Sequence, residues 1–253
     1  MILKINLFAE EFYLQHREIF SFEAKAGIIL DFYSVDYKEL FKNDNSSKFE
    51  SKLNMSPIIS FGIDYSITEK LHSNINFALY KSKALFQAEN FFFAREETSL
   101  EIIKVKTKEV FDYSLDIYTI SAGLSYEIFP RVINGPLKIG TSLSFNFLSN
   151  EFENYEEILS PETSVFIIDG KTTRKRELSK GKNNNINRPI YGLLFSLEHF
   201  LKVSRNMYFT QSISYSPYLQ SISKDYNWHL NSLSFTLGLR ISIIKEMANP
   251  LEP

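Results

Sequence analysis

The segment from Asn231 to Ile243 reads N-S-L-S-F-T-L-G-L-R-I-S-I, and it decides the fold. Its odd-numbered positions from Leu233 to Ile243 are all apolar, and its even-numbered positions, Arg240 among them, are small or polar. Successive side chains of a β-strand point to opposite faces of the sheet, so this segment predicts a strand with one apolar and one polar face.

The same two-row pattern recurs along the chain. It predicts eight strands, at residues 20–33, 55–67, 73–93, 102–129, 137–147, 191–197, 209–219 and 231–243. The polar rows contain mostly Ser, Gly, Thr and Asn rather than charged residues. Small polar groups suit a crowded wet interior, so we predict an all-β fold: a closed antiparallel up-and-down transmembrane β-barrel with lipid outside.

The connectors between these strands alternate between long and short. The short ones are 68–72, 129–136 and 202–206, and the longest is 149–188. Outer-membrane barrels have short periplasmic turns and longer external loops. With eight strands, both termini and all the short turns fall on the periplasmic side, which supports a bacterial outer-membrane location independently of the apolar rows.

Composition excludes several other classes. The 253 residues carry a formal net charge of −2 and include no cysteine, so neither nucleic-acid binding nor a disulfide framework or thiolate metal site is predicted. No uncharged run has the roughly 20 mostly apolar residues of a membrane-spanning helix. We expect three parts: an N-terminal segment 1–18 that resembles the remnant of a signal peptide, a barrel at 19–245, and a periplasmic tail at 246–253.

The connector 149–188 has an acidic part, a basic part and, between them, Val165-Phe-Ile-Ile-Asp-Gly170. Asp-Gly after an apolar run is a hairpin signal, so a hairpin above the membrane is expected here. A further pair of membrane strands, giving ten in all, is the alternative. We also expect external anions such as lipopolysaccharide phosphates to contact the basic part, through Lys171, Arg174, Lys175 and Arg176.

Two local features are predicted within the strands. Leu115 and Ile117 are out of phase with the apolar row that follows them, which indicates a bulge near Ile117 and Tyr118. Aromatic residues near the strand ends predict girdles at the two membrane interfaces. These residues are Tyr33, Tyr65, Tyr126, Tyr191, Tyr215 and Trp228.

The polar rows also contain charged residues that would face the lumen. They are Glu23, Lys25, Asp31, Asp64, Lys138, Glu198 and Arg240. The first and last strands of a closed barrel are neighbours, so Glu23 or Lys25 is expected near Arg240. An eight-stranded barrel leaves room only for side chains or one small ligand. The charges therefore form either a paired plug or a gate whose ion pairs rearrange to pass small solutes.

No catalytic or metal site is predicted. The histidines His16, His72, His199 and His229 lack metal-ligand spacing and lie in no hydrolase motif. An enzyme would need a loop constellation such as Asp225 and His229 with a serine, which almost any set of loops could supply. We therefore expect no enzymatic activity and no cofactor.

Three segments resemble the PorT-like outer-membrane β-barrel family. They are Leu115–Tyr126, Asn134–Phe145 and the carboxy-terminal third from Tyr191 to Ile243. The proline usual in the first of these is replaced near Tyr118. The resemblance covers roughly residues 19–245 and implies an outer-membrane location, but its motifs restate the barrel period and carry over no catalytic residues.

The functional prediction is an outer-membrane β-barrel protein with a structural or interaction role, which could also form a narrow pore for ions or small solutes. Its expected partners are outer-membrane lipid, lipopolysaccharide and other envelope proteins. The alternatives are a lipocalin-like carrier barrel that binds an apolar ligand and an outer-membrane enzyme acting on lipid or peptide.

Overall fold

The computed structural model describes residues 16–35, 50–51, 53–95, 102–132, 135–160, 165–168, 171–182, 186–224 and 227–246. Eight long strands form a ring. They are β1 (His16–Val35), β3 (Asn54–Ser66), β4 (Leu71–Arg95), β5 (Ile102–Val132), β6 (Gly135–Ser160), β10 (Ile190–Lys202), β11 (Met207–Pro217) and β12 (Trp228–Glu246). All neighbours are antiparallel, and the pairing of β10 with β6 closes the ring. The predicted eight-stranded barrel is confirmed.

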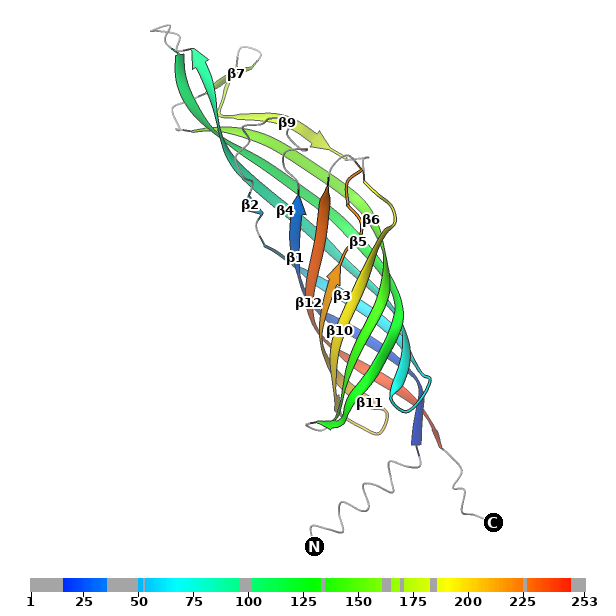
Figure 1. The fold of residues 1–253 in the computed structure, drawn as a ribbon. Coiled ribbons are helices and arrows are strands. Elements are labelled where there is room, and N and C mark those ends of the chain that lie inside the picture. Colours follow the sequence, from blue (N-terminus) through cyan, green and yellow to red (C-terminus); the bar gives the residue numbers. More distant parts are fainter. Residues whose placement is uncertain are drawn as a thin grey trace, which may run out of the picture.

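The short turns β3–β4, β5–β6 and β10–β11 lie at one end of the barrel, where β1 starts and β12 ends (Figure 1). We call this the periplasmic end and the opposite one the outer end. The first residue of β1, His16, pairs with Glu246, so the chain enters and leaves the ring at the same level. Residues 16–18 of the predicted N-terminal segment 1–18 belong to β1, and Glu246 of the predicted tail 246–253 is the last residue of β12. The rest of both segments lies outside the described residues.

The remaining strands stand outside the ring, near the outer end. β7 (Phe166–Ile168) and β8 (Lys171–Thr173) form a two-stranded hairpin, as predicted. β9 (Lys175–Gly181) pairs only with the distal part of β6, and β2 (Glu50–Ser51) only with β4. The ten-strand alternative is therefore wrong, because none of these strands is a member of the closed ring.

The apolar rows face outward. Burial alternates residue by residue along β3, and its outward side chains Ile59, Phe61 and Ile63 are all about half exposed. On β5 the outward row runs from Tyr118 to Ile128, about ten steps of ~3.4 Å. At a tilt of about 45° this row is roughly 24 Å tall, which matches the ~25 Å apolar band of outer-membrane barrels.

The described part of the chain contains no helix long and apolar enough to cross a membrane. The closed ring, the outward apolar band and the polar interior are together the construction of a transmembrane β-barrel of the outer-membrane type. The bacterial outer membrane is therefore the location of this chain.

Tyrosines mark the borders of the band. Tyr65, Tyr126, Tyr191 and Tyr215 point outward and are exposed, as predicted for interfacial girdles. Tyr65 packs against Phe20 at the periplasmic border with ring centroids 5.0 Å apart. Tyr33 and Trp228 were assigned wrongly, because they lie inside the barrel and are 8% and 1% exposed.

The predicted bulge near Ile117 and Tyr118 is also wrong. β4 pairs with β5 without interruption there, and Leu115 and Ile117 simply point inward, fully buried. The irregularity lies in β6 instead, since Ser114 pairs with Phe152 but Asp116 pairs with Ser149. β6 therefore has one residue more than β5 at this point, and the irregular segment contains Asn150, whose φ is 52°. The side-chain amide of Asn150 donates a 2.7 Å hydrogen bond to Asp116. Asparagine tolerates this left-handed conformation better than most residues do.

The extra residue in β6 reverses which side chains face inward. Before Asn150 the inward residues are even-numbered, such as Asn146 and Leu148; after it they are odd-numbered, such as Glu151 and Glu157. β4, β5 and β6 continue beyond the membrane band toward β7 and β9 (Figure 1). We call this outer part, the distal halves of β4, β5 and β6 with β9, the external sheet.

The outward apolar band predicts that a charge placed on the lipid-facing surface lowers the free energy of unfolding, whereas a charge placed above the membrane does not. Leu237 on β12 is 56% exposed to the surroundings, which in the membrane are lipid, and Leu178 on β9 is 42% exposed above the membrane. Leu237→Arg is expected to lower the free energy of unfolding by about 2–4 kcal/mol near mid-membrane. Leu178→Arg is the matched control and should change it little. Urea titration of both variants in lipid vesicles measures the difference, and equal effects would contradict the membrane assignment.

Candidate functional site: a closed lumen

The lumen has three layers of different chemistry. A cluster of ion pairs fills the periplasmic end, a chamber lined by hydroxyl groups lies in the middle, and an apolar aromatic plug fills the outer end. We call these the ion-pair cluster, the chamber and the plug. Each layer is built from the inward rows of several strands, because only those side chains share the interior.

Two cations organise the ion-pair cluster. Lys25 Nζ lies 2.8 Å from Glu23 Oε2 and 2.7 Å from Glu198 Oε1. The Arg240 guanidinium donates hydrogen bonds to Asp64 and to Glu18. Arg240 is 2% exposed, so these contacts take the place of the water that the guanidinium has lost.

A third cation, Lys138, completes the cluster with an aromatic ring. Lys138 Nζ lies 3.9 Å from Asp64 Oδ2 and 5.1 Å from the centroid of the Phe200 ring. Arg240 lies over the same ring at 4.7 Å. Phe200 is 1% exposed, so its ring stabilises both cations in a site that water does not reach.

The structure brings together all the predicted lumen charges except Asp31. Glu23 does pair with Arg240 in the β1–β12 ladder, but the ion pairs of Arg240 are with Asp64 and Glu18. Sequence reasoning missed Glu18 and Phe200. Glu18 was missed because the predicted first strand began only at residue 20, whereas β1 begins at His16. Phe200 was missed because nothing in the period-2 pattern marks an aromatic residue as a cation partner.

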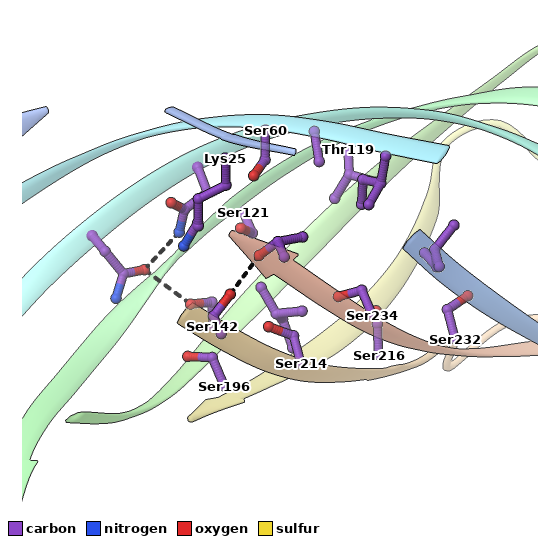
Figure 2. A pocket seen from close by; sticks show the side chains of 18 of the residues that line it. Lys25, Ser60, Thr119, Ser121, Ser142, Ser196, Ser214, Ser216, Ser232 and Ser234 are labelled. Carbon is purple, nitrogen blue, oxygen red and sulfur yellow. Dashed lines mark hydrogen bonds between the residues drawn. The ribbon is translucent and has the colours of Figure 1, made fainter. Parts of the chain in front are cut away.

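The chamber lies directly above this cluster. Its volume is about 90 Å³, counted as the space open to the centres of water molecules. Since one water needs about 10–15 Å³ on that measure, several fit. Figure 2 shows its wall of serine and threonine hydroxyls, contributed by several strands of the barrel. The labelled ones are Ser60, Thr119, Ser121, Ser142, Ser196, Ser214, Ser216, Ser232 and Ser234.

Asp31 lies at the outer limit of the chamber. It is fully buried and accepts hydrogen bonds from Ser82 and, at 2.7 Å, from Ser232. Ser82 also bonds to the Tyr33 hydroxyl, and the neighbouring Tyr80 and Tyr218 hydroxyls are 2.9 Å apart. Asp31 is thus held by hydroxyl groups, apart from the ion-pair cluster with which it was grouped by sequence.

The plug closes the outer end. Trp228 lies at its centre, with ring centroids 4.5 Å from Tyr113, 5.8 Å from Tyr33 and 6.1 Å from Phe86. Other side chains of the same cluster are Ile29, Ile58, Leu115, Ile117, Leu148, Ile186, Ile190, Ile222 and Leu230. These tightly packed aromatic and aliphatic groups fill the outer end of the lumen and leave little room for solutes there.

The basic part of 149–188 is largely paired within the chain. Lys175 lies 3.5 Å from Glu156, Arg176 forms an ion pair with Glu157, and Arg174 donates a hydrogen bond to the Leu159 carbonyl. Lys171 is exposed on β8. Outside the membrane, a hydrogen bond from Asn154 and the charge of Lys175 hold the pKa of the Glu156 carboxyl below its usual range.

No group of three or more His, Asp or Glu side chains in the described residues is arranged to hold a metal ion. His72 is buried and bonds through Nδ1 to the Ser66 hydroxyl at 3.0 Å. His199 faces outward from β10, opposite Gln211 on β11. The Asp225 of the hypothetical loop constellation lies outside the described residues.

Comparisons with known proteins found solved structures only. No protein-family model matches the chain, and no curated protein matches its sequence. Neisserial surface protein A is 11% identical, with a TM-score of 0.45, and the match covers 88% of this chain and 97% of that one. The outer membrane protein OprG from Pseudomonas aeruginosa is 9% identical, with a TM-score of 0.43 and coverage of 90% and 97%.

A third match is Ail, the attachment invasion locus protein of Yersinia pestis. It is 12% identical, with a TM-score of 0.39, and the match covers 89% of this chain and all of that one. Sequence identities this low carry no residue roles from one protein to another. The description of the lumen therefore rests on this chain's own geometry.

Proposed function

We propose that this outer-membrane barrel has a structural or interaction role, in which the ring is the membrane anchor and the external sheet is the surface that contacts partners. The observation that carries the proposal is that side chains fill both ends of the lumen, the ion-pair cluster at one end and the plug at the other. A barrel without an open path is more useful as a support than as a channel.

The external sheet is built to hold its shape. β9 is joined to β6 by backbone pairing and also by the ion pair of Arg176 with Glu157. Tyr155 donates a 3.0 Å hydrogen bond to Glu109, linking β6 to β5 side chain to side chain. A sheet with such cross-links presents a fixed surface, and a fixed surface loses little entropy on binding.

The proposed partners are other envelope proteins, together with the lipid and lipopolysaccharide around the band. The exposed Lys171 and the basic side chains at 174–176 are the proposed contacts for lipopolysaccharide phosphates. Membership of the PorT-like family is part of the same proposal and rests on the three segments that resemble it.

A narrow pore is the second candidate, favoured by the chamber with its hydroxyl wall and charged floor. Conduction would require both the ion-pair cluster and the plug to rearrange. A carrier of apolar ligands is not supported, because mostly hydroxyl, amide and charged side chains line the chamber and the apolar rows face outward.

Site-specific photo-cross-linking in cells separates these candidates. A cross-linker placed at Lys104, which is exposed on the external sheet, should give protein adducts, whereas one at the lumen position Ser234 should give none. The same protein in planar bilayers should show no steady conductance. Absence of adducts across the external sheet, together with steady conductance of the wild type, would favour the pore instead.

A further inference from the structure

The floor of the chamber contains a carboxylate oxygen that has lost water and gained no partner. Glu23 lines the chamber with its side chain 8% exposed. Its Oε2 holds Lys25, whereas its Oε1 is buried and has no hydrogen-bond partner in the described structure. A buried carboxylate oxygen without a partner is unfavourable, so this position favours a bound positive group.

The charges around Glu23 do not balance. Lys25 is shared between Glu23 and Glu198, so this group of three carries one negative charge in excess. The whole ion-pair cluster has the same excess, because four carboxylates, Glu18, Glu23, Asp64 and Glu198, face three cations, Lys25, Lys138 and Arg240. Inside a closed lumen an uncompensated charge is poorly screened and attracts a counter-ion more strongly than it would in water.

Neutral oxygen ligands are available beside it. Glu23 pairs in the ladder with Gly62, and Gly62 pairs with Asn76 on its other side. A β-carbon on Gly62 would lie only 2.3 Å from Asn76 Oδ1, so the missing side chain opens the space into which that oxygen points. Asn76 donates through its Nδ2 to Asn74, at 3.4 Å, and Ser60 lines the same wall of the chamber.

We propose that the chamber holds one small monovalent cation, such as sodium or potassium, bound by Glu23, Asn76 and Ser60 and by waters in the chamber. Oxygen ligands with a single excess charge suit such an ion. A divalent metal is not the occupant, because the described residues contain no cluster of three acidic or histidine ligands. This inference goes beyond the structural role and does not depend on it.

Rubidium is the probe, because it scatters anomalously and replaces potassium. The full chain is refolded into detergent with rubidium chloride and crystallised. An anomalous peak beside Glu23 and Asn76 is expected; it should be lost in Glu23→Gln and kept in Ser234→Ala, a change elsewhere in the same chamber. Asn76→Asp, which adds a carboxylate of similar size, should increase the occupancy.

Stability provides a second readout that does not need crystals. The urea midpoint of the wild type should be higher in rubidium chloride than in choline chloride at equal ionic strength, since choline is too large for the chamber. Glu23→Gln should remove that difference. Water alone in the chamber, with no rubidium peak, or equal midpoints in the two salts would each overturn the proposal by indicating that a proton neutralises Glu23.

Discussion

Arg240→Met is expected to lower the free energy of unfolding by about 3–5 kcal/mol, the cost of breaking a buried ion pair by removing one partner. The reason is that Asp64 and Glu18 both accept hydrogen bonds from a guanidinium that is 2% exposed. Without it, the two carboxylates lie close together in the lumen beside Lys138, whose Nζ is 3.9 Å from Asp64 Oδ2. Urea titration in detergent, followed by tryptophan fluorescence, measures the change.

The matched control removes the carboxylates as well. Arg240→Met combined with Asp64→Asn and Glu18→Gln leaves no unpaired charge at this site, and it should recover most of the lost stability. Arg240→Lys should be intermediate, since an ammonium cannot bond to both acids in the fork geometry of arginine. If Arg240→Met were as stable as the wild type, the ion pairs of Arg240 would not stabilise the periplasmic end of the barrel.

Trp228→Ala is expected to lower the free energy of unfolding by about 3–5 kcal/mol, because it leaves a cavity in a packed core. The indole is 1% exposed and contacts the rings of Tyr113, Tyr33 and Phe86. Trp228 is the one tryptophan of the chain, so unfolding of this variant must be followed by circular dichroism.

Two further variants locate the effect in the plug. Trp228→Phe keeps an aromatic ring and should cost much less than Trp228→Ala. Tyr215→Ala removes an aromatic residue that is 43% exposed on the outer surface, and it should cost less than Trp228→Ala. Equal losses for Trp228→Ala and Tyr215→Ala would mean that Trp228 is an interfacial residue after all.

The eight strands could be predicted from sequence because the two faces of each strand meet different surroundings. Lipid outside and a wet lumen inside force an alternation that survives in segments such as 55–67 and 231–243. Interior charges followed from the same alternation, since Lys25, Glu198 and Arg240 stand in polar rows. The partners of these charges could not be predicted in the same way, because ion pairs depend on the tilt of the strands and on how far each side chain reaches across the barrel.

The plug was missed because its inward residues are apolar, and they look out of phase in a polar row. Leu115 and Ile117 were interpreted as a bulge for this reason, although they keep the inward parity of Ser121. Tyr33 has the parity of Asp31, and Trp228 has that of Ser232, so parity could have placed both inside. The reversal at Asn150 had no such signal, since one inserted residue changes the parity without changing composition.

Heat-modifiability of the protein on a denaturing gel tests the central claim, a closed barrel that spans the membrane. Protein extracted from the outer-membrane fraction is loaded with and without boiling. The ring closed by β6 and β10 should resist the detergent until boiled, so the two samples should migrate differently. Identical migration, with the protein fully soluble in the absence of detergent, would contradict the membrane barrel.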